Sequence, residues 1–304
     1  RTYLGRTYLG RSEPREADRK VAITAIEQAM HSRPDLSVEL SFVRELLLGS
    51  RNAPGPPGDQ GRSSASRQAV QAFQQLSAAL TAKGVEDTAF YRYHRLISLN
   101  EVGGAPEQFG CSVDQFHRFV AQRAARWPHS MNATATHDTK RGEDVRARLN
   151  VLSEIPEAWQ ERLERWHGLN SHHRQPTRNG SLPDKNTEYL LYQTLIGAWL
   201  QPPEPADGFG ARIDAYMIKA AREAGRHTSW RRPDPNYEDA LSAFVGGILD
   251  PSPENAFLPD LADFCRPIAW YGAINSLSQC LLKIALPGLP DFYQGTELPQ
   301  LALV

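Results

Sequence analysis

The stretch Met131-Asn132-Ala133-Thr134-Ala135-Thr136-His137-Asp138-Thr139-Lys140-Arg141 decides the fold prediction. Its first five residues form a short apolar run that predicts a β-strand, and the next six form a polar loop that contains a His-Asp pair. Side chains that follow the strands of a β/α barrel converge at one rim. If this strand belongs to such a barrel, Asp138 is the first candidate for a catalytic carboxylate.

A second run near the end of the chain has the same character. Ile284–Leu289 is apolar and leads through Pro290 and Asp291 into the polar stretch Tyr293–Glu297. A buried parallel strand reads as a continuous apolar run, and its polar end would reach the same rim as Asp138. Helices dominate elsewhere, so the pattern favours an α/β fold, a β/α barrel with large helical insertions. A pure helical bundle fits the pattern as well.

The remaining elements are predicted from helical spacing of apolar residues and from capping residues. The chain between 50 and 66 is rich in Gly, Pro, Ser and charge, which predicts a flexible, exposed connection. The predicted helices cover about 12–33, 37–49, 70–80, 116–127, 143–149, 159–166, 185–199, 212–225 and 268–282.

Composition excludes several classes of function. The 304 residues carry 34 Lys and Arg against 35 Asp and Glu, so a net charge of −1 gives no bulk field for nucleic acid or an anionic membrane. Three widely spaced cysteines argue against a disulfide framework and for a reducing compartment, the cytoplasm by default. No apolar run approaches the ~20 residues of a membrane span. The adjacent His172 and His173 lie in a polar segment and are predicted as solvated loop, so no metal site is expected.

The two ends suggest an excerpt from a longer protein. Residues 1–5 are repeated verbatim as residues 6–10, which we interpret as an artefact, and the chain starts without methionine. We expect a helical insertion subdomain at 11–128, with its flexible loop at 50–66. Two barrel strands are expected within 129–304, separated by a helical insertion at 150–260.

Five blocks of the sequence carry a specific resemblance. In their order along the chain they are Ala82–Tyr93, Ser98–Gly104, Ala135–Leu149, Asn186–Trp199 and Pro287–Leu298. Together they resemble the maltooligosyl trehalose synthases, which are members of the α-amylase clan of glycoside hydrolases and transferases. The resemblance implies the second half of a (β/α)8 TIM barrel, with Asp138 after the seventh strand and Tyr293 after the eighth.

The resemblance also implies roles for individual residues. Asp138 corresponds to the third catalytic carboxylate, which binds ring hydroxyls and stabilises an oxocarbenium-like transition state, and His137 beside it donates to a hydroxyl. Lys140, Arg141, Lys185 and Glu188 are candidates for the wall of the site or for salt bridges that hold the insertion. The remaining substrate-binding candidates are Lys83, Glu86, Arg92 and Tyr93, near the reducing-end sugar, together with Asn100, Glu101 and Tyr293.

The reaction that the resemblance implies is an intramolecular transglycosylation, an isomerisation in trehalose biosynthesis. The last α-1,4 bond of a maltooligosaccharide becomes an α,α-1,1 bond, with no cofactor. The implied partners are a linear α-1,4-glucan and, as a functional link, a maltooligosyl trehalose trehalohydrolase. Water would divert a covalent intermediate to hydrolysis, so the insertions are expected to exclude it.

A glycosidic reaction of this type needs two further carboxylates. We expect the nucleophile and the general acid upstream of Arg1, and hence an inactive isolated chain. Asp214 in Arg212-Ile213-Asp214 imitates a nucleophile strand, but it follows Asp138 in the chain and continues a helix. The alternatives are an α-amylase-clan hydrolase and a noncatalytic glucan-binding fragment.

Overall fold

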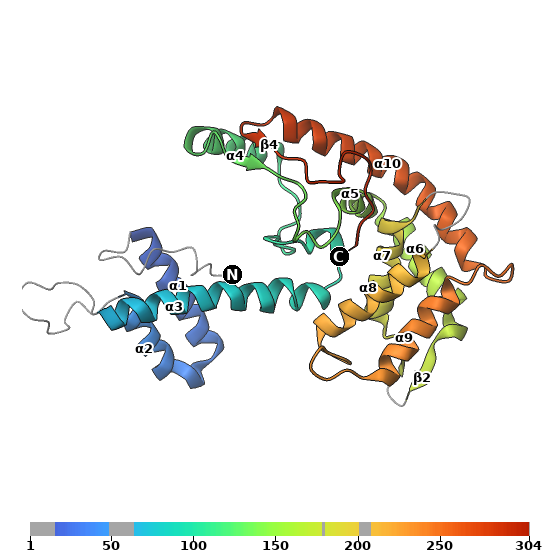
Figure 1. The fold of residues 1–304 in the computed structure, drawn as a ribbon, viewed down its shortest axis with the longest axis horizontal. Coiled ribbons are helices and arrows are strands. Elements are labelled where there is room, and N and C mark those ends of the chain that lie inside the picture. The colour runs from blue at the N-terminus through green and yellow to red at the C-terminus, as the bar shows by residue number, and fades with distance from the viewer. Residues whose placement is uncertain (1–15, 49–63, 178–179, 201–207, 304) are drawn as a thin grey trace, which may run out of the picture. The chain divides into compact units, whose positions relative to one another are not determined.

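The computed structural model describes residues 16–48, 64–177, 180–200 and 208–303 (Figure 1). The chain divides into two compact units, Arg1–Val85 and Glu86–Val304. The insertion predicted for 11–128 thus contributes to both units. The repeated segment 1–10 lies outside the described residues.

The first unit is helical. Helices α1 (Glu16–Ser32), α2 (Ser37–Leu48) and α3 (Ser64–Thr81) share a small core made of Ala22, Ile26, Leu47 and Val70, and the 3-10 turn η2 (Pro34–Leu36) connects α1 to α2. Most of the connection predicted at 50–66 lies outside the described residues. Its last three residues are helical, because α3 begins at Ser64 and serine is common at helix starts.

The second unit holds the larger core. A π-helical turn, η3 (Ala82–Glu86), covers the boundary in the sequence. The 3-10 turns of this unit are η4 (Ala89–Tyr91), η5 (Ile97–Leu99), η6 (Leu152–Glu154) and η7 (Ser171–His173). Its helices are α4 (Val113–Arg126), α5 (Glu143–Val151), α6 (Pro156–Leu169), α7 (Lys185–Ala198), α8 (Phe209–Ala224), α9 (Pro235–Ile248) and α10 (Phe257–Ala285).

Helix α5 lies between α7 and α10 at close range (Figure 1). A Cβ added to Gly197 of α7 would lie 2.7 Å from Val145 Cγ1, and one added to Gly272 of α10 would lie 2.6 Å from Arg148 Cγ. Glycine is therefore what allows both helices to approach α5.

One pair of short strands matches the two strands predicted from sequence. Strand β1 (Met131–Asn132) pairs in parallel with β4 (Leu289–Pro290). Both strands are shorter than predicted, and Ile284 and Ala285, predicted as strand, form the end of helix α10. Gly288 permits the close approach, since a Cβ there would lie 2.4 Å from the Ser130 carbonyl oxygen and its φ is +128°. Across the described residues the fold is helix-dominated, and the carboxyl ends of β1 and β4 lie at the same edge.

Two elements are absent from the sequence predictions. Helix α9 begins after the capping residue Asp234, whose carboxylate accepts from the N–H groups of Asn236 and Tyr237. The segment predicted as loop near His173 continues into an antiparallel hairpin of β2 (Gln175–Thr177) and β3 (Gly180–Leu182). The three-residue strands are too short to show the alternation on which strand prediction depends.

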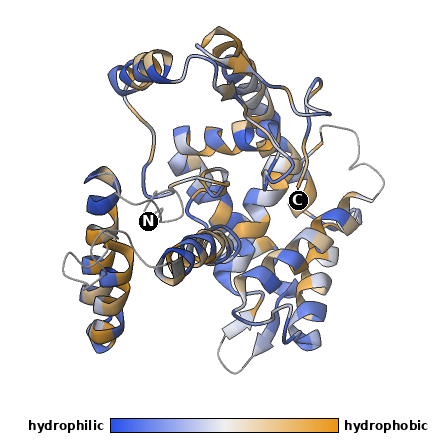
Figure 2. Ribbon diagram, turned by 60° about the vertical axis from the view of Figure 1, so that its left-hand side comes forward, coloured by the Kyte–Doolittle hydropathy of each residue, from blue (hydrophilic) through white to orange (hydrophobic). Residues whose placement is uncertain are grey.

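The second half of α10 keeps hydrophobic side chains exposed, and Figure 2 shows the hydropathy of the residues along the ribbon. Trp270 is 68% exposed, Leu277 71% and Leu281 67%. A surface helix of a soluble domain normally hides such residues on one face. No described helix is long and apolar enough to cross a membrane.

Candidate active site

The loop after β1 is a tight turn made by two threonines. The Thr136 N–H donates to Thr139 Oγ1 at 2.7 Å, and the Thr139 N–H donates back to the Thr136 carbonyl at 3.2 Å. The Asp138 N–H also donates to Thr136 Oγ1. The two threonine side chains thus fix the backbone of the turn.

His137 and Asp138 stand at the tip of this turn. Their side chains are 81% and 74% exposed, and His137 Nε2 lies 3.8 Å from Asp138 Oδ2. Neither side chain has a closer protein partner among those described. The turn thus presents a free carboxylate and an imidazole to whatever lies outside it.

The residues just after the tip turn inward. Arg141 is 1% exposed and donates to the Ile97 carbonyl at 3.3 Å, to the Asn100 carbonyl at 3.4 Å and to Tyr216 Oη at 2.7 Å. Lys140 Nζ lies 2.9 Å from Asp87 Oδ1. A buried guanidinium with three oxygen partners is a structural anchor for the base of the loop.

The segment 98–104 supports the same base. Asn100 is 1% exposed, and its side-chain amide donates to the carbonyls of Phe90 at 3.0 Å and Tyr93 at 2.6 Å. The carboxylate of Glu101 accepts from the backbone N–H groups of Lys140 and Arg141. Two predicted blocks, far apart in sequence, are therefore joined by direct bonds.

Glu188 lies elsewhere, on α7. It is 2% exposed and accepts from Tyr192 Oη at 2.7 Å and from Arg174 Nη1 at 3.1 Å, while His167 Nδ1 lies 2.8 Å from it. For Glu188 and Lys140 the sequence left two roles open, a wall of the site or a salt bridge. The structure shows a salt bridge for each, from Arg174 to Glu188 and from Lys140 to Asp87.

Four of the predicted substrate-contact residues bond within the protein in this structure. The side chains of Asn100, Lys140, Arg141 and Glu188 face the protein interior, and their polar atoms bond to protein groups. Direct contact with a sugar would require them to exchange these buried partners, which is costly. Composition and spacing gave the residue types but could not reveal these partners, which for Lys140 and Arg141 lie 40 or more positions away in the sequence.

The other predicted contacts lie nearer the surface. Glu86 accepts from the Gly103 N–H at 2.9 Å, Arg92 Nε donates to the Ala224 carbonyl, and Tyr93 is 45% exposed. Lys185 is exposed at the start of α7. Lys83 is exposed too, but it belongs to the first unit and is described with that unit alone.

Tyr293 follows β4 and is partly buried. Its carbonyl accepts from the backbone N–H and the hydroxyl of Thr296, at 3.0 and 2.6 Å. The chain then returns beside the other loop, since the Gly142 N–H donates to the Ala302 carbonyl at 3.0 Å. The segments after β1 and after β4 are therefore held together.

A polar cluster that the sequence did not predict lies beneath this edge. Lys283, with a 3% exposed side chain, donates to Thr134 Oγ1 at 2.8 Å and lies 3.6 Å from Glu143 Oε2. Arg146 donates to the Thr134 carbonyl, and burial lowers the pKa of this guanidinium. The sequence signal for this cluster is Lys283 itself, a charged residue within the apolar end of α10.

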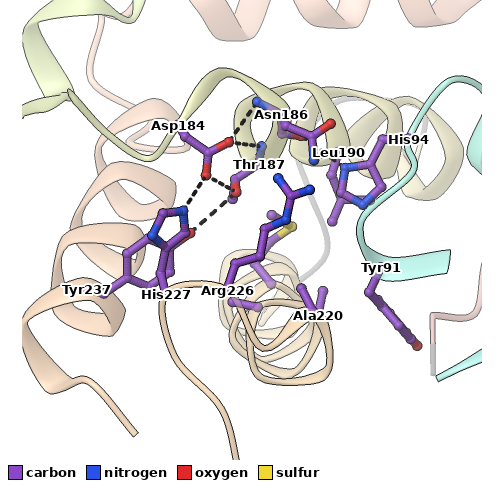
Figure 3. Close-up of a pocket in the computed structure, with 13 residues that line it drawn as sticks. Tyr91, His94, Asp184, Asn186, Thr187, Leu190, Ala220, Arg226, His227 and Tyr237 are labelled. Atoms are coloured by element: carbon purple, nitrogen blue, oxygen red, sulfur yellow. Dashed lines mark hydrogen bonds and ion pairs between the residues drawn. The ribbon is translucent and has the colours of Figure 1, made fainter. Parts of the chain in front are cut away.

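An enclosed pocket lies between α7, α8 and the segment near Tyr91 (Figure 3). Its wall includes His94, whose Nδ1 donates to the Asn186 carbonyl at 3.1 Å and whose Nε2 has no protein partner. Burial lowers the pKa of His94, which favours the neutral ring. The cavity volume of about 20 Å³ holds about one water molecule and is too small for a glucose ring.

Asp214 lies within helix α8, in agreement with the rejection of a nucleophile strand there. No group of three or more His, Cys, Asp or Glu in the described part of the chain could hold a metal ion. Each of the three cysteines is free.

The comparisons with known proteins point in one direction. No family model matches the chain. Proteins of two Mycobacterium tuberculosis strains, described as candidate maltooligosyl trehalose synthases, are 40% identical to it over 226 residues, which is 74% of this chain. The chain spans 28% of the length of these relatives.

Solved structures give the same result. The maltooligosyltrehalose synthase of Arthrobacter ramosus matches 94% of this chain and 33% of its own, with a TM-score of 0.77 and 36% identity. A hypothetical maltooligosyl trehalose synthase of Sulfolobus tokodaii matches 92% of this chain and 40% of its own, with a TM-score of 0.68 and 32% identity.

All of these matches bear the names of trehalose-forming enzymes. Within that class, the chain is homologous to one family, the maltooligosyl trehalose synthases, over about a third of the family's length.

Proposed function

We propose that this chain supplies part of the active site of a maltooligosyl trehalose synthase. The observation that carries the proposal is the 40% identity to relatives with that name, over a region that includes most of the chain. The parent protein would then be an isomerase that converts the reducing-end α-1,4 bond of a maltooligosaccharide into an α,α-1,1 bond. Its substrate class would be linear α-1,4-glucans, and its product would suit a trehalohydrolase.

The proposed scaffold is the second half of a (β/α)8 barrel. Strands β1 and β4 pair in parallel and are connected through helices, as neighbouring barrel strands are. Asp138 and Tyr293 follow the carboxyl ends of these strands, where barrel enzymes place their catalytic groups.

In the proposed mechanism, Asp138 binds hydroxyls of the sugar ring at the site of cleavage. Its carboxylate is free of protein donors, so it can accept hydrogen bonds that strengthen as positive charge develops on the sugar. His137 lies close enough to share the same sugar. The nucleophile and the acid that the chemistry requires would come from the other part of the enzyme.

The exposed candidates Arg92, Tyr93 and Lys185 would line the route of the glucan, and so would the partly buried Glu86 and Tyr293. An aromatic ring such as that of Tyr93 can stack on the apolar face of a pyranose. No cofactor enters the proposed reaction. We place the parent protein in the cytoplasm, which the free cysteines favour.

The test replaces Asp138 with Asn in a full-length synthase polypeptide that carries this sequence. With maltohexaose as substrate, we expect a loss of about 10²–10³-fold in kcat, because the neutral amide stabilises the developing charge poorly. Asp114→Asn, an exposed change on α4, is the matched control and should leave the rate unchanged.

The products decide between the alternatives. Intramolecular transfer removes reducing ends, whereas hydrolysis by an amylase-type enzyme creates them. A rise in reducing sugar with the wild-type polypeptide would favour the hydrolase, and binding without any turnover would favour a glucan-binding protein. The 304-residue chain alone is expected to give no transfer product.

A further inference from the structure

We propose that Glu101 is a positioning residue, which holds the loop that carries Asp138 and does not itself bind sugar. The inference rests on the proposed function and deepens it. It changes the role that the sequence suggested for Glu101, from substrate contact to support.

The first observation is the set of donors around this carboxylate. Oε1 accepts from the Lys140 N–H at 2.8 Å and from the Val102 N–H at 2.8 Å, and Oε2 accepts from the Arg141 N–H at 3.2 Å. Two consecutive backbone amides thus point at one carboxylate. Hydrogen bonds to an ionised acceptor are roughly twice as strong as neutral ones, so this contact can fix the two backbone amides that lie between the turn and the start of α5.

The second observation is that Glu101 itself stands on a rigid base. The neighbouring Asn100 is buried, and its side-chain amide donates to two carbonyls. The carbonyl of Glu101 accepts from the Gly104 N–H at 2.7 Å. A Cβ at Gly104 would lie 2.6 Å from the Leu99 carbonyl oxygen, so this turn is tightly closed. The backbone that carries the Glu101 side chain is therefore fixed by bonds that do not involve the Asp138 loop.

The third observation is the position of these bonds relative to Asp138. Thr136 and Thr139 fix the turn internally, and Glu101 fixes the residues immediately after it. Without the Glu101 carboxylate, the Lys140 side chain would still bond to Asp87 and the Arg141 side chain to Tyr216. The backbone N–H groups of Lys140 and Arg141 would lose their acceptor. A carboxylate displaced by 1 Å can lose about 10²-fold in rate.

The variant Glu101→Gln separates positioning from sugar binding. Glutamine keeps the size of glutamate and one acceptor oxygen, but its NH2 group would face one of the two amides and could not accept from it. Glu107→Gln, an exposed change in the same segment, is the matched control. Glu101→Asp is the second variant, in case Glu101→Gln does not fold.

Two measurements are made on the full-length polypeptide. Hydrogen exchange should become at least about 10-fold faster in Glu101→Gln at whichever of the Lys140 and Arg141 amides loses its acceptor, and it should stay unchanged in Glu107→Gln. With maltohexaose, kcat should fall about 10- to 100-fold while KM changes less than about 3-fold.

Each other outcome overturns the inference. Unchanged hydrogen exchange would mean that Glu101 does not fix the backbone of the loop. Faster exchange with a normal kcat would mean that fixing the loop does not contribute to the reaction rate. A raised KM with normal kcat would make Glu101 a sugar ligand. Failure of the proposed function is seen separately, as a wild-type polypeptide that forms no transfer product.

Discussion

For Asp138 and Glu101, the sequence predicts the chemical type and local setting of each residue, but not the groups that each carboxylate contacts. The prediction that 136–141 forms a polar loop after a strand needed only local pattern, and the loop lies there. The difference between a carboxylate that faces outward and one that binds backbone amides depends on residues about 40 positions apart. Local pattern therefore identifies which residues can do chemistry, while the fold decides which of them are available to do it.

At the same scale, Asp260 should make stability depend on pH. It accepts from Trp166 Nε1 at 2.7 Å and Arg162 Nη1 at 2.6 Å. Burial acts to raise the pKa of Asp260, but these donors outweigh burial and hold that pKa below its usual range. The folded pKa is thus lower than the unfolded value of about 3.9, so the stabilisation is complete above that pH and is lost as pH falls through the folded pKa.

We therefore expect Asp260→Asn to lower the free energy of unfolding by about 1–3 kcal/mol at pH 7. The gap between variant and wild type should narrow as the pH falls below about 4. Urea unfolding at a series of pH values measures both effects. A gap that stays constant down to pH 2.5 would show that ionised Asp260 is not the cause.

Among the elements, helices were predictable because their apolar residues recur with helical spacing. The strands were less so. Strand β1 ends at Asn132, earlier than predicted, and the following residues belong to the polar contacts around Lys283 and Glu143. Helix α9 carried a clear start in Asp234-Pro235, a capping residue followed by a proline at the first helical position.

The close contact of α5 with α7 gives a prediction at this scale. Gly197→Ala should destabilise the protein by about 1–3 kcal/mol, because its Cβ would lie 2.7 Å from Val145 Cγ1 in a packed core. Gly246→Ala on α9 is the control, since no atom lies within 4 Å of its added Cβ. The control should gain up to about 1 kcal/mol from helix propensity.

Thermal unfolding of the two alanine variants tests this directly. The melting temperature should fall in Gly197→Ala and should rise slightly in Gly246→Ala. Equal shifts would mean that the contact between α5 and α7 yields easily to a methyl group, and that the glycine does not set the distance between the helices.

On the scale of the molecule, part of the hydrophobic surface has no partner within the described residues. The structure shows exposed Trp270, Leu277 and Leu281 along α10, and the relatives are about three times longer than this chain. In the proposed barrel, the remaining strands would come from the part of the relatives' length that this chain does not span, so local pattern in this sequence cannot predict them.

The isolated chain should consequently associate through this face. Exposed apolar patches of this kind promote self-association. We expect Leu277→Lys with Leu281→Lys to shift the chain towards monomer in analytical ultracentrifugation and to reduce binding of a hydrophobic dye. Ala158→Lys with Gln160→Lys, at exposed positions on α6, serves as the charge-matched control. A monomeric wild-type chain would contradict the prediction.

The buried guanidinium of Arg141 carries one more consequence. It joins the base of the Asp138 turn to Tyr216, and so to α8 in the middle of the large core. An ordinary surface loop frays well below the temperature at which its domain melts. Here the turn cannot loosen without breaking a bond inside the core, so heat inactivation should coincide with global melting instead of preceding it.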